Sequence, residues 1–175
     1  MAGLVPLARQ LTQAIARHIG YIARMRVIES LPALRALVGQ DVAQSDWITV
    51  TQEQVNQFAE ATGDHQWIHV DVERAKKGPF GAPIAHGFLT LSLVPKFFEN
   101  AIDIRQTSMG VNYGLNRVRF PAPVPVGSRL RADLKLLACD PIDNSGMQMT
   151  WEVTVRREGS DKPVCVAETV SRRYP

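Results

Sequence analysis

The segment from Ile84 to Phe98 is apolar on nearly every helical face, and it constrains the fold more than any other part of the chain. A helix without a polar face has to be buried on most sides. Pro95 lies inside the segment and should kink or end the helix, because proline has no backbone N–H to donate. The chain therefore needs a surface that can cover one central helix.

Four strand-like segments follow this helix. Residues 108–120, 128–139, 147–157 and 163–173 are rich in Val, Thr and Leu with alternating stretches, and the turn-forming sequences PAPVPVG, DPIDNSG and REGSDKP separate them. Short turns between successive strands favour antiparallel pairing. The sequence therefore predicts an α+β fold, with an antiparallel sheet wrapped around a long central helix.

The region before the central helix contains further predicted elements. Residues 45–51, SDWITVT, alternate and are β-branched, which predicts a strand. Thr51 should cap a helix that has Gln54 in the capping-box position and that ends at Gly63. The buried stripe of this helix is expected to comprise Val55, Phe58 and Ala59. A short polar helix is expected around residues 72–77.

Asp64 and His69 lie five residues apart in FAEATGDHQWIHVD, where Gly63 interrupts the helical pattern. A carboxylate and an imidazole on a fixed turn can share one water molecule, with the carboxylate accepting its proton. Such a pair is typical of hydratases and hydrolases. Asp is also a common turn residue and His a common packing residue, so the spacing alone leaves a structural role open.

Residues 78–88, GPFGAPIAHGF, form a loop rich in glycine and proline that leads into the central helix. The first N–H groups of a helix lack partners and lie at the positive end of its dipole, so they can stabilise a developing oxyanion. We expect Gly87 at this position, because a missing side chain lets a substrate carbonyl approach the backbone. A plain, tightly packed loop is the alternative.

The two motifs together resemble the MaoC-like (R)-specific enoyl-CoA hydratases, whose usual string is GD-x-N-P-x-H-x-D, followed here by FG-x-x-IAHG. The matching residues are Gly63, Asp64, His69 and Asp71, whereas Gln66 and Trp67 replace the Asn and the Pro. Residues 116–132, NRVRFPAPVPVGSRLRA, are similar to the family's second strand, proline turn and third strand. The resemblance covers about residues 45–175.

This resemblance implies one hotdog domain over residues 29–175 and a homodimer. It also implies reversible hydration of trans-2-enoyl-CoA to (R)-3-hydroxyacyl-CoA, or of the same enoyl group on a carrier protein, with no metal and no redox cofactor. Asp64 and His69 would be catalytic. The expected substrate-binding residues are Gln66, Trp67, His86 and Gly87. Two alternatives stay open: a hotdog acyl-CoA thioesterase, and a non-catalytic subunit that binds acyl thioesters.

Residues 1–28 differ from the rest of the chain. They contain four arginines and no acidic residue, whereas the rest of the chain has sixteen basic and seventeen acidic residues. The positive net charge therefore lies in this extension. Leucine and isoleucine recur there at helical spacing, which predicts a basic amphipathic helix. It could dock on the dimer, lie on a membrane surface or have no function. No interleaved aromatic pattern suggests nucleic-acid binding.

Length and composition fit one globular domain. The chain has 175 residues, of which 45% are hydrophobic and 21% charged, and this is enough to bury a core. No apolar run approaches the roughly 18 residues of a membrane span. Cys139 and Cys165 have no metal-binding neighbours, so we expect reduced packing residues. Without a recognisable secretory signal, we expect a cytoplasmic protein.

Overall fold

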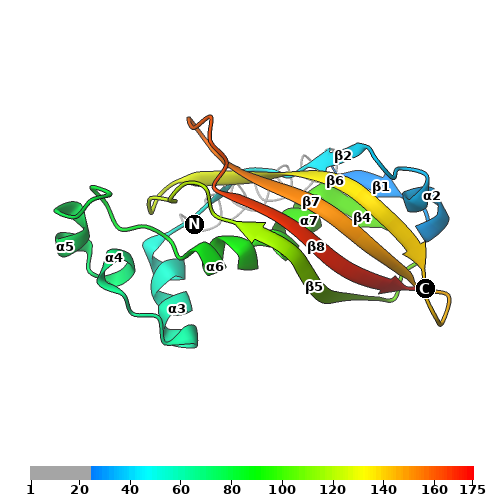
Figure 1. Cartoon of the computed structure of the whole chain (residues 1–175), viewed down its shortest axis with the longest axis horizontal. Helices are drawn as coiled ribbons and strands as arrows, with labels where there is room; N and C mark the ends of the chain where they lie inside the picture. Colours follow the sequence, from blue (N-terminus) through cyan, green and yellow to red (C-terminus); the bar gives the residue numbers. More distant parts are fainter. Residues whose placement is uncertain (1–24) are drawn as a thin grey trace, which may run out of the picture.

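The computed structural model describes residues 25–175, and Figure 1 shows them from blue to red along the chain. The basic amphipathic helix predicted near the N-terminus lies outside the described residues. The last residues of the predicted extension are described, and they form strand β1 (Arg26–Ile28). This strand pairs in parallel with β4 (Ile102–Ile104), which follows the central helices.

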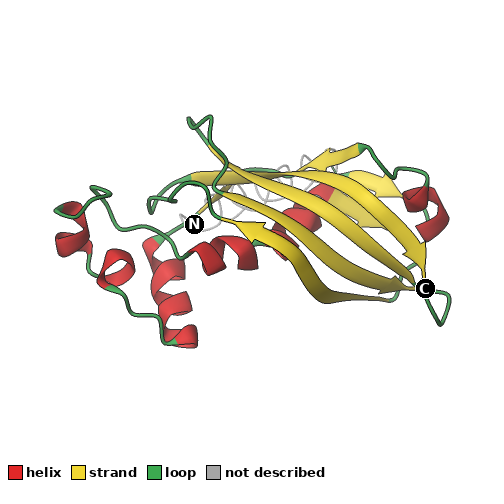
Figure 2. Ribbon diagram, in the orientation of Figure 1, coloured by secondary structure: helices red, strands yellow, loops and turns green. Residues whose placement is uncertain are grey.

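One antiparallel sheet forms the larger part of the molecule (Figure 2). Its strands, in spatial order, are β2 (Asp41–Gln44), β6 (Arg129–Pro141), β7 (Met147–Arg157), β8 (Cys165–Tyr174) and β5 (Met109–Arg119). The short strand β3 (Ile48–Thr49) pairs with the start of β6. The four strands predicted after the central helix are confirmed, within about two residues at each end.

The strand predicted over residues 45–51 is largely wrong, because only Ile48 and Thr49 of that segment are in a strand. Ser45 is buried and exchanges hydrogen bonds with Ala132 on β6: its backbone N–H donates to the carbonyl of Ala132, and its hydroxyl accepts from the N–H of Ala132. A side chain thus replaces a backbone group at this point, which interrupts the regular ladder.

The long central helix of the sequence-based prediction is divided in two. Helix α6 (Gly87–Ser92) ends at Leu93, and α7 (Val94–Ala101) begins at the next residue. Pro95 lies in the first turn of α7, where its missing N–H leaves no hydrogen bond unmade. The second helix extends past Phe98 to Ala101. Helix α7 lies across one face of the sheet. Helix α6 leads from there towards the end of the molecule where the helices of residues 52–76 lie (Figure 2).

The core lies between α7 and the sheet. Phe97 on α7 and Trp151 on β7 are almost fully buried. The ring of Phe98 packs edge-on against that of Trp151, with 5.1 Å between the ring centroids. Burying an aromatic side chain of this size contributes about 2–3 kcal/mol. Cys139 and Cys165 are buried free thiols, and burial raises the pKa of Cys165 to about 11. Both therefore remain protonated packing residues.

Four further helices are described, and all but the first of them position the segment that contains Asp64 and His69 (Figure 1). They are α2 (Leu31–Arg35), α3 (Gln52–Thr62), α4 (Trp67–Val70) and α5 (Val72–Lys76). Helix α3 begins with the predicted capping box, in which Thr51 and Gln54 bond each other's backbone N–H groups. Helix α4 was not predicted, because its four residues are too few to show a helical period.

None of the helices in the described part of the chain is both long enough and apolar enough to cross a membrane. The expected cytoplasmic location stays a prediction.

Candidate active site

The Asp64 turn begins where α3 ends. Gly63 adopts a left-handed conformation, with φ of 77°, and its N–H bonds the carbonyl of Ala59. A residue with a side chain would be strained at this φ, so glycine stops the helix here. The Asp64 carboxylate accepts a hydrogen bond from the N–H of Gln66 at 3.4 Å and is otherwise exposed. The carboxylate is thus held on one side and open on the other.

His69 lies on α4 and is only 6% exposed. Its Nδ1 lies 2.7 Å from the carbonyl oxygen of Ile84. Because a carbonyl can only accept, Nδ1 carries the proton of the neutral ring, and Nε2 has a free lone pair. Burial lowers the pKa of His69, as does the neighbouring His86, while the Ile84 carbonyl and Asp64 act in the opposite direction. The ring is therefore held neutral and basic at Nε2.

His86 contacts both catalytic candidates. Its ring stacks on that of His69, with 3.7 Å between centroids and 28° between planes. Its Nε2 lies 3.0 Å from the backbone carbonyl oxygen of Asp64. The ring also lies beside that of Phe58 on α3, with 5.0 Å between centroids and 50° between planes. A histidine placed in this way contacts both members of the pair without pointing at open solvent.

One side-chain nitrogen or oxygen from each of Asp64, His69 and His86 lies within 4.8 Å of the others. This spacing suits one shared water molecule. It fits a metal ion poorly, because two rings stacked with 28° between their planes cannot both aim a lone pair at an ion about 2 Å away. The expected convergence of Asp64 and His69 is therefore present in the structure, and proton transfer suits it better than metal binding.

Gly87 is the first residue of α6, so its N–H has no intrahelical partner. No backbone carbonyl in residues 25–175 accepts a hydrogen bond from it. A Cβ at this position would lie 2.9 Å from the ring of Phe120. The sequence suggested that glycine is needed for the substrate's approach. The structure adds a second reason, which is that Phe120 already occupies the space a side chain would need.

Gln66 and Trp67 are placed differently from each other. Gln66 is exposed beside Asp64. The Trp67 ring instead packs against Gly78, where a Cβ would lie 2.9 Å away, and under the guanidinium of Arg74 at 4.4 Å. Gln66 is thus free to reach a substrate, whereas Trp67 fills the space between α4 and α5. The sequence leaves open whether Trp67 lines the acyl pocket or fills the core, and these contacts favour a packing role.

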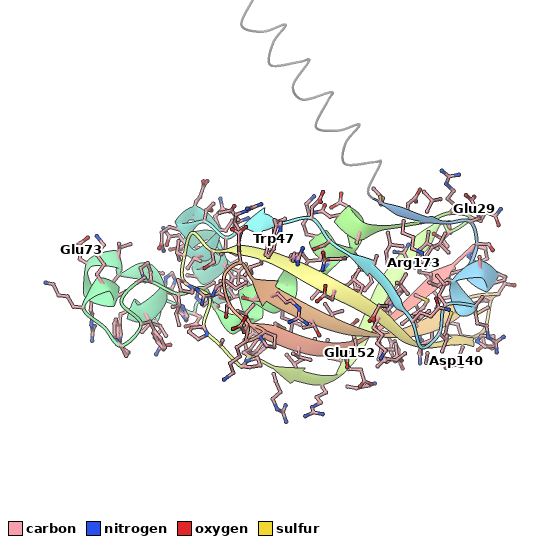
Figure 3. The ribbon with its side chains drawn as sticks, turned by 90° about the horizontal axis from the view of Figure 1, so that it is seen from above. Glu29, Trp47, Glu73, Asp140, Glu152 and Arg173 are labelled. Atoms are coloured by element: carbon pink, nitrogen blue, oxygen red, sulfur yellow. The ribbon has the colours of Figure 1, made fainter. Side chains whose placement is uncertain are left out.

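Two other groups of charged residues do not join the site. His65 is half-exposed and lies 3.8 Å from Glu60, so it does not form a metal site with His69. On β6, Arg129 pairs with Glu158, and Arg131 lies 4.5 Å above the ring of Trp47. Trp47 lies near the helical end of the molecule (Figure 3). Because these two arginines already interact with Glu158 and Trp47, their surface is a weaker candidate for binding phosphate.

Comparison with known proteins decides the family. The sequence profile of the MaoC-like domain matches residues 34–157, which is more than half of the chain. The chain belongs to the MaoC-like domain family. It is 55% identical over 148 residues to 3-hydroxyacyl-thioester dehydratase Z of Mycobacterium tuberculosis, an alignment covering 85% of this chain and 98% of that protein. It is 46% identical over 144 residues to nodulation protein N of Rhizobium leguminosarum bv. viciae, covering 81% and 89%.

Solved structures show the same fold. The monoamine oxidase regulatory protein of Archaeoglobus superposes with a TM-score of 0.68 at 26% identity, covering 86% of this chain and 97% of that one. The (R)-hydratase from A. caviae gives a TM-score of 0.58 at 23% identity, covering 78% and 98%. The predicted MaoC-like family, the α+β hotdog fold and the hydro-lyase class are confirmed.

Sequence reasoning missed an aromatic pair beside the MaoC-like site. Phe88 directly follows Gly87 and is 68% exposed, and its ring meets that of Phe120 at 5.9 Å. The helix was expected to be buried on most sides, so an exposed Phe was not anticipated. Nothing in the sequence around Phe120, which precedes a proline turn, indicated that this residue would lie beside the site. Both rings lie next to the amide expected to bind the substrate carbonyl.

Proposed function

We propose that the protein catalyses the reversible addition of water to a trans-2-enoyl thioester, giving an (R)-3-hydroxyacyl thioester. The observation that carries the proposal is that a carboxylate oxygen of Asp64 and a ring nitrogen of His69 lie within 4.8 Å of each other, while the Ile84 carbonyl holds Nδ1 of His69 and leaves Nε2 as the basic nitrogen. The names of the relatives support the reaction class. Stereochemistry, and CoA rather than a carrier protein, follow only from the family resemblance.

The two acceptors define how a water molecule would be held. A carboxylate and a neutral Nε2 both accept, so one water can donate one hydrogen to each and keep a lone pair free for C3 of the substrate. The water oxygen bonds C3, and the electron pair of the C2–C3 double bond moves towards the thioester carbonyl. The N–H of Gly87 stabilises the resulting enolate oxygen. The proton taken by the pair then returns to C2, so that atoms and charge balance.

An absorbance assay tests the proposal. Purified protein is mixed with crotonyl-CoA and with longer trans-2-enoyl-CoA esters, while the conjugated enoyl band and free thiol are followed in parallel. We expect the band to decay without thiol release, and chiral analysis to give the (R)-3-hydroxy product. Thiol release would instead identify a thioesterase. If neither signal changes on any substrate in the panel, the chain is not an enzyme for free enoyl-CoA.

We also propose that the protein is a homodimer that pairs through β5. This strand is a long open edge, and its side chains Met109, Val111, Tyr113 and Leu115 are 42–58% exposed. A cavity of about 1130 Å³ lies between β5 and the helices α6 and α7. An open apolar edge of this length is a site of pairing with another chain. A second copy would satisfy the backbone of β5 and cover the cavity.

A matched pair of substitutions tests the dimer. Val111 on β5 and Val38, which lies near β6 towards the opposite edge, are both close to 40% exposed. Val111→Glu should give a monomer by sedimentation velocity at micromolar concentration, whereas Val38→Glu should leave the dimer intact. A monomeric wild-type protein, or equal effects of the two substitutions, would argue against pairing through β5.

A further inference from the structure

His86 makes contacts that its expected role in substrate binding does not explain. It is 2% exposed, and it is the N-cap residue of α6. Its side chain does not cap that helix. It reaches away from the helix, to the Asp64 carbonyl and to the face of the His69 ring. One buried side chain therefore joins two catalytic residues that come from the same short segment of chain.

We infer that His86 is a positioning residue: its Nε2–H bond to the Asp64 carbonyl and its ring, stacked on that of His69, hold both groups at their shared water. The inference rests on the proposed function, because it assigns His86 a role in the same site. It differs from substrate binding, since both contacts are to the protein.

The hydrogen bond determines the tautomer of His86. The Asp64 carbonyl only accepts, so Nε2 has to carry the proton. Nδ1 is then an acceptor, and it is buried with no hydrogen-bond partner among the described residues. The two ring nitrogens of His86 therefore differ: Nε2 donates to the Asp64 carbonyl, and Nδ1 carries a lone pair.

The neighbouring groups give His69 the opposite tautomer. The titratable groups that face His69 are Asp64, from the turn after α3, and His86, from the start of α6. Its Nδ1–H is held by the Ile84 carbonyl, so Nε2 is free to exchange a proton with the water. Two stacked imidazoles thus have opposite tautomers, and only one of them exposes its free nitrogen to the reaction. The His86 ring also covers one face of the His69 ring and excludes solvent from it.

Three substitutions separate the two contacts of His86. His86→Phe keeps a flat ring stacked on His69 but loses the bond to Asp64. His86→Gln keeps an N–H near the position of Nε2 but loses the ring. His86→Leu loses both. Phe58→Leu is the control, because the Phe58 ring contacts that of His86 and its side chain forms no hydrogen bond with Asp64 or His69. Thermal unfolding of each variant separates loss of fold from loss of rate.

Steady-state kinetics over a range of pH provide the first test. For His86→Phe we expect kcat to fall about 10- to 100-fold with KM little changed, because a displaced general base lowers only the chemical step. For His86→Gln we expect a smaller loss, and an acid limb of kcat/KM at higher pH, because His69 gains contact with water. Phe58→Leu should lower the unfolding temperature without moving that limb. Equal kinetics and equal pH profiles in all four variants would overturn the inference.

Nitrogen NMR of the histidine rings tests the inference independently of activity, so a failure of the proposed reaction does not affect it. In protein with ¹⁵N-labelled imidazoles, we expect His86 to show the Nε2–H tautomer. His69 should show the Nδ1–H tautomer, and its pKa should lie below the ordinary value because the ring is buried. An Nδ1–H tautomer of His86 would overturn the inference.

Discussion

The helical segment between Gln52 and Ala101 and the sheet between Met109 and Tyr174 are organised on different principles. In the helical segment, buried polar groups occupy positions set by individual hydrogen bonds, as His69 and His86 do. In the sheet, alternating apolar side chains occupy a continuous core, in which Trp151 is 1% exposed. We therefore expect catalytic rate and folding stability to depend on different residues, so that substitutions can separate them.

The largest expected effect is on rate, in the helical segment. Asp64→Asn keeps the shape of the side chain but removes the general base, so kcat should fall about 1,000-fold while the unfolding midpoint stays near that of the unmodified protein. Asp71→Asn is the matched control. Asp71 caps α5 by accepting from the N–H of Arg74, and asparagine caps equally well. A similar loss of rate in both variants would argue against a special role for Asp64.

The next effect is on stability, in the sheet. Trp151→Ala should lower the free energy of unfolding by about 3–5 kcal/mol, because it leaves a cavity in the core beside Phe98. Trp67→Ala should cost clearly less, since Trp67 is only half-buried and packs at the helical end. Denaturant unfolding followed by circular dichroism measures both. Equal losses would mean that the helical segment contributes as much to stability as the sheet does.

Gly87 lies where the two regions meet, and a double substitution tests which of them requires the glycine. Gly87→Ala should lower kcat/KM about 10-fold, because the new methyl group meets the Phe120 ring and shifts the backbone N–H. Adding Phe120→Ala removes the clash and should restore most of the activity. If the double variant stays as slow as the single one, the substrate rather than Phe120 requires the missing side chain.

The smallest effect is the pH dependence of stability. Burial lowers the pKa of His69 in the folded state, so the unfolded chain binds the proton more readily. The contribution of His69 to stability is thus complete above its ordinary pKa of about 6.5 and declines as the pH falls from there through the folded value. His69→Gln should flatten this part of the stability curve. An unchanged slope in chemical denaturation between about pH 7 and pH 5 would show that burial does not perturb His69.

Much of the fold was predictable because its signals are local. The four long strands show in the alternation and in the turn sequences, and the start and end of α3 show in Thr51, Gln54 and Gly63. The parallel pairing of β1 with β4 was not predictable. These strands are separated by more than seventy residues, and neither short segment contains a pattern that specifies its partner.

For the site, the sequence identified the residue types but not how they are held. The spacing in the sequence led to the prediction of Asp64 and His69 as catalytic, and the glycine-rich loop to that of Gly87 as the residue beside the substrate carbonyl. The stacking of His86 on His69 and the closeness of Phe120 to Gly87 join segments that are distant in the sequence, so no spacing predicts them. The role of Trp67 stayed open for the same reason, since its contacts with Gly78 and Arg74 exist only after folding.

The exposed pair of Phe88 and Phe120 has a practical consequence for protein engineering. Both rings lie beside the Gly87 amide that we propose binds the substrate carbonyl, and no hydrogen bond links their side chains to Asp64, His69 or His86. A library that varies these two positions, with a glycine kept between His86 and Phe88, is therefore expected to change which acyl groups are accepted while the proposed acid–base pair stays intact.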